Sequence, residues 1–485
     1  MGSRARAIGL SALVTLISVE ATAYASEAQV PLQKEPNVVI IYADDLGYGD
    51  LAIYGHHTIQ MPNLDQLARE GVRLTNFYAP SPLCSPSRAG LMTGRTPFRT
   101  GIRSWIPEGT NVQLEAQEIT IATLLKREGY ETFLGGKWHL NAGLHLEDQA
   151  QPEDHGFDHW MALHAFPIPH NRNPTNFFRN GEPLGEVEGY TAQIAIDESI
   201  EWLRARDGSR PFFMYLAMVE PHSTHANPED FNALYKHLTR GVPEPIVNGL
   251  PTPPSELLAA RGPGEYYANI TYMDAQIGRF LAALDEAGHR NSTIVFFASD
   301  NGPVTTVWRN WWEVNLYGST GGLRGRKGDL YEGGIREPAF IRWPGHIEPD
   351  TVSDAIVNGY DVLPTLASVI GLEVPSDRPI DGEDFSTIFS GSNFQRQRPL
   401  YWEFDDVAGF HYALRDGDWK LLADESLDRV ELYNLATEQF EVLNQAAKQP
   451  DVLKAMLAKL NEIADSVRSD PLRPSWVQVN REGAE

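Results

Sequence analysis

Cys84 is the only cysteine of the chain and lies in the run Cys84-Ser85-Pro86-Ser87-Arg88. A lone cysteine is more often a small apolar side chain of the core, but this one stands in a polar loop that contains prolines. The residues that follow predict a short helix that begins near Pro86. The start of a helix presents free backbone N–H groups, which favour anions. Cys84 is therefore a candidate nucleophile, and Arg88 is a candidate ligand for an anion.

Two pairs of residues could bind a divalent cation through oxygen. They are Asp44-Asp45 and Asp300-Asn301, which together offer three carboxylates and one amide. Such oxygen ligands suit Ca²⁺ or Mg²⁺ and not zinc, which prefers His and Cys. Either pair alone would be more typical of a turn. Because each pair follows a predicted strand, the two together predict a metal site, with Ca²⁺ expected and Mg²⁺ as the alternative.

Four further side chains could place positive charge or move protons at such a site. Lys137 and His139 are two residues apart on a predicted extended segment, so their side chains should point the same way. His222 follows a proline, and Lys327 lies in a loop flanked by glycines. Each alone is more typical of a structural histidine or a surface lysine. As a set, they supply cations that could surround one anionic group.

Short apolar runs precede these polar clusters and predict buried strands. They are Val38–Ala43, Thr132–Leu134, Pro211–Val219, Thr293–Ala298 and Pro338–Trp343. Helical patterns lie between them, at Asn63–Glu70, Ile119–Glu128, Gln193–Arg206 and Tyr266–Ala287. This alternation predicts an α/β fold with a large mixed, mainly parallel sheet that helices flank on both faces. Since ligands bind beyond the carboxyl ends of parallel strands, we expect the polar clusters at one edge of this sheet.

The sequence changes character past about residue 390. Short strands separated by turns are predicted at Pro399–Phe404, Tyr412–Arg415, Trp419–Ala423 and Val430–Asn434, and a helix at Asp451–Val467. These elements predict a smaller C-terminal antiparallel α+β domain. We therefore expect a catalytic domain at residues 26–392 and a second domain at residues 393–485.

The first 25 residues have the pattern of a secretory signal peptide. Two arginines precede an apolar run at residues 7–19, and Ala23-Tyr24-Ala25 resembles a cleavage site. The run is too short to span a membrane comfortably, and no later stretch is apolar enough, so no membrane anchor is expected. We expect export to the periplasm or secretion, or a lysosomal or extracellular location in a eukaryotic host. An exported protein meets abundant Ca²⁺, which is why Ca²⁺ is preferred over Mg²⁺.

The net charge of the chain limits its partners. The formal net charge is −25 at pH 7, which disfavours nonspecific binding to nucleic acid or to anionic membranes. An anionic substrate therefore needs a local cationic pocket or a metal. With one cysteine, the chain has no internal disulfide framework.

Two motifs resemble the signatures of the type I sulfatase family. Residues 84–94 match C-x-P-S-R-A-x-L-M-T-G, and residues 129–139 resemble G-Y-x-T-x-x-x-G-K-W-H. The resemblance covers residues 36–435 and is to the arylsulfatase A and N-acetylgalactosamine-6-sulfatase branch. It implies an alkaline-phosphatase-like fold and hydrolysis of sulfate esters.

The resemblance also implies a modified nucleophile. Cys84 would be converted to Cα-formylglycine by a dedicated maturation enzyme. One hydroxyl of the aldehyde hydrate would attack sulfur, and loss of the proton of the other would expel sulfate. The metal, expected to be Ca²⁺, would be bound by Asp44, Asp45, Asp300, Asn301 and the modified Cys84.

The cationic residues take their roles from the same resemblance. Arg88 would hold the hydrate, and Lys137 would bind sulfate and brace the hydrate. His139 would accept the proton in the elimination step. His222 and Lys327 would contact sulfate and the leaving oxygen, one of them as general acid.

Other functions stay open at this point. The chain could hydrolyse phosphate or phosphonate esters, or it could be an inactive protein that binds sulfated glycans with Cys84 unmodified. The expected substrate is a sulfated saccharide, with a small aryl sulfate as the alternative. Candidate selector segments, which contain aromatic and His or Arg side chains, are residues 164–172, 308–312 and 404–411.

Overall fold

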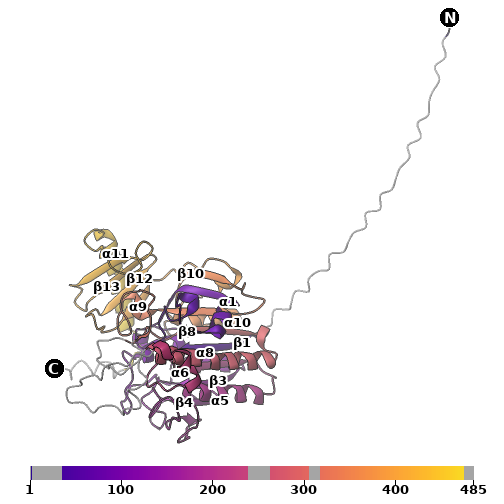
Figure 1. The fold of residues 1–485 in the computed structure, drawn as a ribbon. Coiled ribbons are helices and arrows are strands. Elements are labelled where there is room, and N and C mark those ends of the chain that lie inside the picture. The colour runs from indigo at the N-terminus through magenta and orange to yellow at the C-terminus, as the bar shows by residue number, and fades with distance from the viewer. Residues whose placement is uncertain (1, 3–34, 239–262, 305–316, 475–485) are drawn as a thin grey trace. The chain divides into compact units, whose positions relative to one another are not determined.

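The structure is a computed structural model that describes residues 2, 35–238, 263–304 and 317–474. The described residues from 35 to 474 form one compact unit (Figure 1). The expected signal peptide, apart from residue 2, and the segment 308–312 lie outside the described residues. Within the described part, no helix is long and apolar enough to cross a membrane. The domain boundary at residues 392 and 393 stays a prediction.

The described residues contain a ten-stranded sheet with the order β10-β2-β9-β8-β1-β7-β3-β4-β5-β6. Its strands are β1 Asn37–Ala43, β2 Val72–Tyr78, β3 Glu131–Lys137, β4 His159–Leu163, β5 Phe178–Arg179, β6 Glu182–Pro183, β7 Phe212–Ala217, β8 Thr293–Ser299, β9 Arg336–Arg342 and β10 Thr351–Asn358. Strands β8, β1, β7, β3 and β4 are parallel, whereas β9 is antiparallel to both β8 and β2. The predicted mixed, mainly parallel sheet is confirmed.

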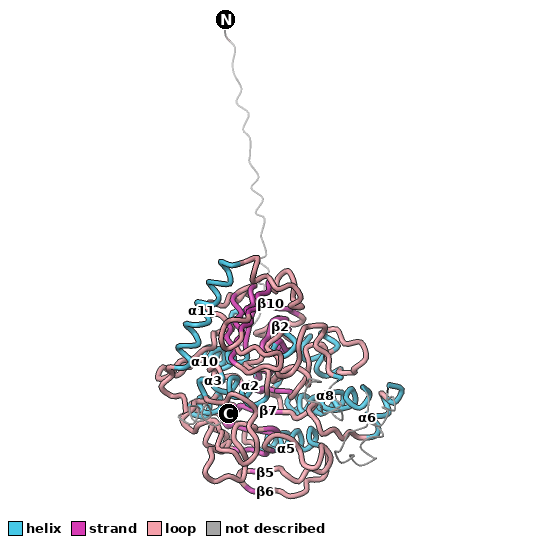
Figure 2. The backbone as a smooth tube through the Cα atoms, turned by 90° about the vertical axis from the view of Figure 1, so that its left-hand side faces the viewer, coloured by secondary structure: helices cyan, strands magenta, loops and turns pink. Residues whose placement is uncertain are grey.

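Helices cover both faces of this sheet (Figure 2). The described helices that precede the second sheet in the chain are α1 Pro62–Arg69, α2 Cys84–Thr93, α3 Pro97–Thr100, α4 Ile121–Arg127, α5 Thr191–Ala205, α6 Glu229–Leu234, α8 Pro263–Glu286, α9 Glu332–Ile335 and α10 Val362–Ile370. Short 3-10 turns lie at Ala52–Tyr54, Lys236–Leu238, Arg290–Ser292, Gly359–Asp361 and Ser386–Ser390.

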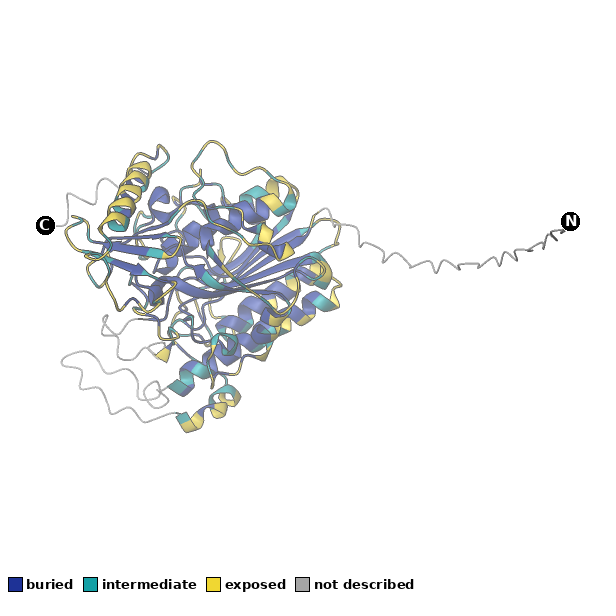
Figure 3. Cartoon of the chain, turned by 90° about the horizontal axis from the view of Figure 1, so that it is seen from above, coloured by how far each residue is buried: buried dark blue, intermediate teal, exposed yellow. Residues whose placement is uncertain are grey.

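Alternate residues of β1 belong to two different cores. Val38, Ile40 and Tyr42 pack with α2, α4 and α10 on one face, and Val39 and Ile41 pack with α1, α5 and α8 on the other. Successive strand side chains point to opposite faces, so a strand buried on both sides must be apolar at every position. This is why β1 is a continuous apolar run, and why the sheet is buried throughout its centre (Figure 3).

A second, four-stranded antiparallel sheet follows in the order β11-β12-β13-β14. Its strands are β11 Leu400–Glu403, β12 Tyr412–Asp416, β13 Trp419–Ala423 and β14 Val430–Asn434, and α11 Pro450–Arg468 follows them. Leu421 packs with α11. Its neighbour Leu422 packs with Leu330 and Tyr331, which follow Lys327 in the chain. The second sheet therefore shares one core with the segment that carries Lys327.

The end of α11 also reaches the segment that follows α2. The Asp470 carboxylate accepts hydrogen bonds from Arg95 Nη2 at 2.6 Å and from Arg99 Nη1 at 3.2 Å. All three side chains are almost fully buried. The last part of the described chain is thereby joined to the region just after Cys84.

A group of buried charges joins the two sheets, and we call it the inter-sheet ion cluster: Tyr78, Glu332, Arg415, Lys420 and Glu441. Lys420 Nζ lies 2.9 Å from Glu332 Oε1 and 2.8 Å from Glu441 Oε1. Tyr78 donates to Glu332 Oε2 at 2.7 Å, and Arg415 donates to the Tyr78 hydroxyl. Burial raises the pKa of Glu441 to about 7, a shift that Lys420 opposes and Glu332 reinforces.

Candidate active site

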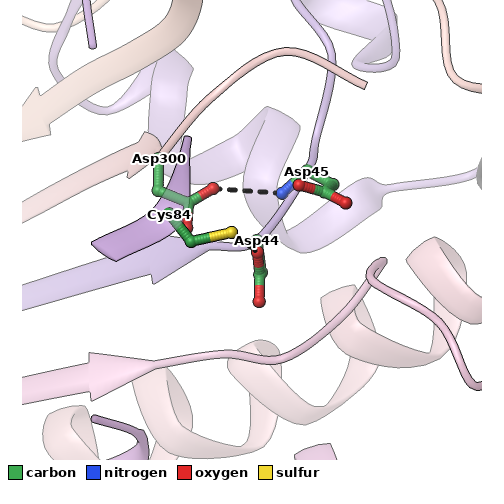
Figure 4. Close-up of side chains that lie close together, drawn as sticks. All are labelled: Asp44, Asp45, Cys84 and Asp300. Carbon is green, nitrogen blue, oxygen red and sulfur yellow. Dashed lines mark hydrogen bonds between the residues drawn. The ribbon is translucent and has the colours of Figure 1, made fainter. Parts of the chain in front are cut away.

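Four oxygen-bearing residues lie at the carboxyl ends of two adjacent strands. Asp44 and Asp45 follow β1, and Asp300 and Asn301 follow β8. The two strands are parallel and in register from Asn37 and Thr293 to Ala43 and Ser299, so their next residues must meet. The backbone N–H of Asp45 donates to Asp300 Oδ1 at 3.1 Å (Figure 4).

Cys84 lies beside these carboxylates (Figure 4). Helix α2 begins at Cys84 itself and not near Pro86, which places the thiol at the first helical position. Cys84 is 2% exposed, and its Sγ donates to Asp44 Oδ1 at 3.4 Å. One ligand atom from each of Asp44, Asp45, Cys84 and Asp300 lies within 4.8 Å of the others. These four side chains could therefore share one metal ion.

Asn301, the fourth oxygen ligand predicted from the sequence, is also placed to bind a cation. Asn301 donates through Nδ2 to Asp45 Oδ1 at 2.7 Å, which turns its Oδ1 the other way. This oxygen is buried and has no hydrogen-bond partner among the described residues. Burial, and then the Asp44 carboxylate, raise the pKa of Asp300 to about 7. A bound cation would satisfy Asn301 Oδ1 and would favour the ionised form of Asp300, as expected for an all-oxygen Ca²⁺ or Mg²⁺ site.

Each of the three carboxylates has a cationic partner. Lys137 Nζ donates to Asp44 Oδ2 at 2.5 Å, and Lys327 Nζ donates to Asp45. Arg88 donates to Asp300 Oδ2 through Nε at 3.1 Å and through Nη2 at 2.8 Å. All six side chains are buried.

These cations dominate the local electrostatics. Although burial opposes it, Lys137 and then His222 hold the pKa of Asp44 well below its usual range. Lys327 Nζ lies 3.3 Å from Cys84 Sγ, so one cation contacts both a metal-ligand candidate and the nucleophile candidate. The three cations are matched by the three carboxylates, so a bound divalent cation would give the site the positive charge that binding an anion needs.

The two histidines differ in exposure. His139 is buried, with Nε2 3.2 Å from the Ile106 carbonyl and with Nδ1 lacking a partner among the described residues. Its φ of 54° departs from extended backbone, so the alternation that predicted a common direction for Lys137 and His139 does not apply. Burial, and then Lys137, hold the pKa of His139 well below its usual range, so the ring is neutral.

His222 lies on the open side of the site. Its side chain is 20% exposed, and Nε2 is 3.8 Å from Asp45 Oδ2. Its Nδ1 is 2.5 Å from the Ser223 carbonyl, which only accepts, so Nδ1 carries a proton. His222 is thus positioned between the buried carboxylates and solvent.

Two tyrosines support Arg88 and were missed from sequence. Tyr215 of β7 accepts from Arg88 Nη1 at 3.4 Å, and the Tyr42 ring of β1 lies 5.5 Å from the Arg88 guanidinium. Both lie inside apolar runs, where the sequence alone does not distinguish a tyrosine that contacts Arg88 from one that only packs in the core.

The loop that carries Lys327 is held by backbone hydrogen bonds from several segments. Lys327 N donates to Pro303 O at 3.0 Å, and Gly328 N donates to Pro82 O at 3.0 Å. Val407 N donates to Gly328 O at 3.1 Å, and Leu330 N donates to Asp406 Oδ2 at 3.2 Å. This network links Lys327 to the Cys84 loop and to the second sheet.

The segment 404–411, a candidate selector of substrate, is part of this network, and its ring-bearing side chains are buried. Phe404, Phe410 and His411 are 7%, 2% and 4% exposed, so their rings are not available to stack on a substrate. The segment 164–172 is different, since Phe166 and Ile168 are 45% and 43% exposed.

Comparison with known proteins agrees with this arrangement. The family model named Sulfatase matches residues 36–372, and a model described as N-sulphoglucosamine sulphohydrolase, C-terminal, matches residues 326–466. The chain therefore belongs to the sulfatase family.

Similar proteins and solved structures indicate which class of enzyme the chain belongs to. The chain is 33% identical to arylsulfatase A of Bos taurus over 484 residues, covering 87% of this chain and 88% of that protein. It is 32% identical to N-acetylgalactosamine-6-sulfatase of Homo sapiens over 396 residues, covering 77% and 69%. The crystal structure of Ps i-CgsB in complex with k-i-k-neocarrahexaose aligns with a TM-score of 0.76 at 25% identity, covering 92% and 96%. The chain is a sulfuric ester hydrolase.

Proposed function

We propose that the protein hydrolyses sulfate esters of saccharides, with a Cα-formylglycine made from Cys84 as nucleophile and Ca²⁺ as the bound metal. The observation that carries this proposal is the position of Cys84. It begins a helix, lies within 4.8 Å of three carboxylate oxygens, and stands in a sulfatase-type motif. When present, the formylglycine hydrate supplies a nucleophilic hydroxyl, and Ca²⁺ supplies Lewis-acid polarisation of the sulfate.

The metal would be held by Asp44, Asp45, Asp300, Asn301 and residue 84. The unpartnered Oδ1 of Asn301 supports this set, since the amide would otherwise leave a buried oxygen unsatisfied. Mg²⁺ is the alternative cation. The donor types fit either one.

Three cations would hold the nucleophile and the sulfate group. Arg88 is fixed by Asp300 and Tyr215 and would hold the nucleophile in place. Lys137 and Lys327 would contact sulfate oxygens, because each already lies against a carboxylate at the rim of the metal site. Preorganised charges of this kind stabilise the negative charge that develops in the transition state.

Two histidines would move the protons. His139 is neutral and has Nδ1 without a partner among the described residues, which suits a base that accepts the hydrate's proton. His222 is partly exposed, and its Nε2 faces the side from which a substrate arrives. Once protonated there, His222 could donate to the leaving oxygen.

Maturation and location form part of the same proposal. Cys84 is 2% exposed, so a formylglycine-generating maturation enzyme would need to act before the chain folds. Residues 1–25 would direct export to the periplasm or outside the cell. Exported proteins meet Ca²⁺ in quantity, which agrees with the preferred metal.

The test combines peptide mass spectrometry across Cys84 with paired kinetics. Protein made with its maturation enzyme should show formylglycine at position 84 and should hydrolyse 4-nitrophenyl sulfate faster than 4-nitrophenyl phosphate. Faster turnover of the phosphate would favour a phosphate or phosphonate ester hydrolase. An unmodified thiol in protein from the native host, without sulfate ester hydrolysis, would favour a sulfated-glycan-binding protein.

A further inference from the structure

A cavity of about 190 Å³ lies beside the candidate active site and is not used by the proposed chemistry. Trp105, Phe166 and Ile168 line it and are 49%, 45% and 43% exposed. Large apolar side chains left open around one hollow are typical of a surface that binds a ligand. The polar side chains Glu108 and His145 also contribute to the lining.

One wall of the cavity is tied directly to the catalytic residues. Ile106, next to Trp105, donates from its backbone N–H to Ser85 Oγ at 3.1 Å. The Ile106 carbonyl lies 3.2 Å from His139 Nε2. Ser85 follows Cys84 in the chain, so the backbone beside Trp105 is fixed between the nucleophile candidate and the base candidate.

The opposite wall has a second link to the same centre. The ring of His164, which lines the cavity, meets the ring of His139 edge to face with centroids 5.3 Å apart. His164 Nε2 is 2.8 Å from the Asn141 carbonyl, so Nε2 carries the proton and Nδ1 is the acceptor. Burial lowers the pKa of His164, which keeps the ring neutral and able to accept a hydrogen bond from a hydroxyl.

The volume of the cavity and the side chains that line it determine which kind of ligand it can hold. Sites for drug-sized ligands hold about 300–1,000 Å³, so this cavity takes one ring and not a polycyclic or oligomeric leaving group. A pyranose presents C–H faces to apolar side chains and hydroxyls at its edge, which matches apolar walls with histidine and glutamate between them. The Glu108 carboxylate disfavours a second anionic group on the same ring.

We propose that this cavity, lined by Trp105, His164, Phe166 and Ile168, binds the single, otherwise neutral pyranose ring that carries the sulfate ester, with Trp105 as the residue that determines specificity for it. This inference rests on the proposed function, because the sulfate must occupy the site formed around Cys84. Trp105 contacts the sugar and takes no part in the chemistry.

The experiment uses the mature, formylglycine-containing protein and its Trp105→Ala and Trp105→Tyr variants. The probes are galactose 4-sulfate, galactose 6-sulfate and their N-acetylgalactosamine counterparts, with inorganic sulfate as a competitive inhibitor. For at least one sugar, Trp105→Ala should raise KM by about tenfold, the size of one lost stacking contact, while kcat changes by less than about threefold. Trp105→Tyr should restore most of the affinity.

Two controls separate this effect from general damage. Inhibition by inorganic sulfate should be unchanged in Trp105→Ala, because sulfate alone does not reach the cavity. Leu234→Ala removes a large side chain of similar exposure, 44%, on α6 and should leave KM unchanged. A sulfate inhibition constant that rises together with KM would show that the variant disturbs the catalytic residues and would overturn the assignment to the cavity.

Failure of this inference can be told apart from failure of the proposed function. If the wild-type protein hydrolyses sulfated sugars and Trp105→Ala leaves every KM within about twofold, the sugar-binding role is wrong. If it hydrolyses 4-nitrophenyl sulfate but none of the four sugars, the pyranose assignment is wrong and the sulfatase activity stands. If nothing is hydrolysed, equilibrium binding of the same sugars decides, since loss of binding in Trp105→Ala would still support the cavity and equal binding would overturn it.

Discussion

The active site and the inter-sheet ion cluster are both buried groups of carboxylates and cations, yet they are organised differently. In the active site, carboxylate and thiol ligand atoms converge within 4.8 Å, and Asn301 Oδ1 lacks a partner among the described residues. In the inter-sheet ion cluster, both oxygens of Glu332 are matched, one by Lys420 and one by Tyr78. Glu441 lies against Lys420 and accepts from the Glu332 backbone N–H at 2.7 Å.

This difference separates a charge cluster that receives a ligand from one that completes a fold. Charges that are already paired and hydrogen-bonded repay their desolvation without any further partner. In the candidate active site each carboxylate also has a cationic partner, but oxygen atoms and the Cys84 thiol converge on one point, an arrangement that a shared metal ion would complete. Both clusters are buried groups of carboxylates and cations, so the distinguishing observation is that four ligand atoms converge within 4.8 Å in the candidate active site.

The largest expected effect comes from Cys84→Ala. This variant removes the proposed nucleophile and should lower kcat for 4-nitrophenyl sulfate by a factor on the order of 10⁶. Its thermal unfolding should stay close to that of the wild-type protein, because the Cys84 side chain makes two hydrogen bonds with the residues that the structure describes. A variant that keeps more than about one hundredth of the activity would contradict the role of residue 84.

A matched pair of lysine variants tests the comparison directly. Lys420→Met removes the cation that lies against both Glu332 and Glu441 and should lower the free energy of unfolding by about 3–5 kcal/mol, measured by urea denaturation. Lys327→Met should instead lower kcat/KM by about 10²–10³-fold. If Lys420→Met does not fold, adding Glu441→Gln should restore folding. Loss of activity per folded molecule in Lys420→Met would argue against a purely structural cluster.

Chelation should affect only the active-site cluster. Removing Ca²⁺ with EGTA should lower the melting temperature, because a ligand at one hundred times its Kd stabilises the folded state by about 2.7 kcal/mol. Adding Ca²⁺ should reverse the change, and a comparison with Mg²⁺ identifies the preferred ion. Asp300→Asn should abolish the response. A melting temperature that is indifferent to chelator and to both ions would contradict the metal site.

The last expected effect is a dependence of stability on pH. The pKa of Glu441 is about 7 in the folded protein, against an ordinary value of 4.5, so the folded state binds more protons between these values. Stability from this group is therefore complete below about pH 4.5 and is lost as pH rises through about 7. Glu441→Gln should flatten this decline, by up to about 3 kcal/mol, in urea denaturation series at pH 4.5–8. The exposed Glu462→Gln should leave the slope as it is.

How much the sequence could predict depends on how each element is buried. Strands β1 and β8 were predicted to within one residue, because both faces are covered and every position is apolar. Strand β2 was missed because its polar residues Arg73 and Asn76 interrupt the run, and β10 because it lies at the edge with alternate residues exposed. The residues of β9 do not indicate that it is antiparallel to its neighbours, because this depends on the strands beside which it is placed in the sheet.

The candidate site could be predicted from the rule that ligands bind at the carboxyl ends of parallel strands, whereas the contacts between distant segments could not. Parallel strands bring their carboxyl ends together, so Asp44 and Asp300 could be placed in one site from sequence. The pairing of Lys420 with Glu332 joins β13 to α9 across 88 residues, and no local sequence pattern predicts it. Trp105 was missed for a similar reason, because its position depends on the bonds of Ile106 to residues from two other segments.

The junction of Asp470 with Arg95 and Arg99 has a consequence for the order in which the protein is completed. A chain is synthesised from its N-terminus, so the segment after Cys84 emerges long before residue 470. Until then two arginines, which end up buried, lack the carboxylate that they share. The segment just after α2 therefore gains this shared carboxylate only once residue 470 has been made. A chain cut off before residue 470 would leave Arg95 and Arg99 without the carboxylate that joins them in the folded protein.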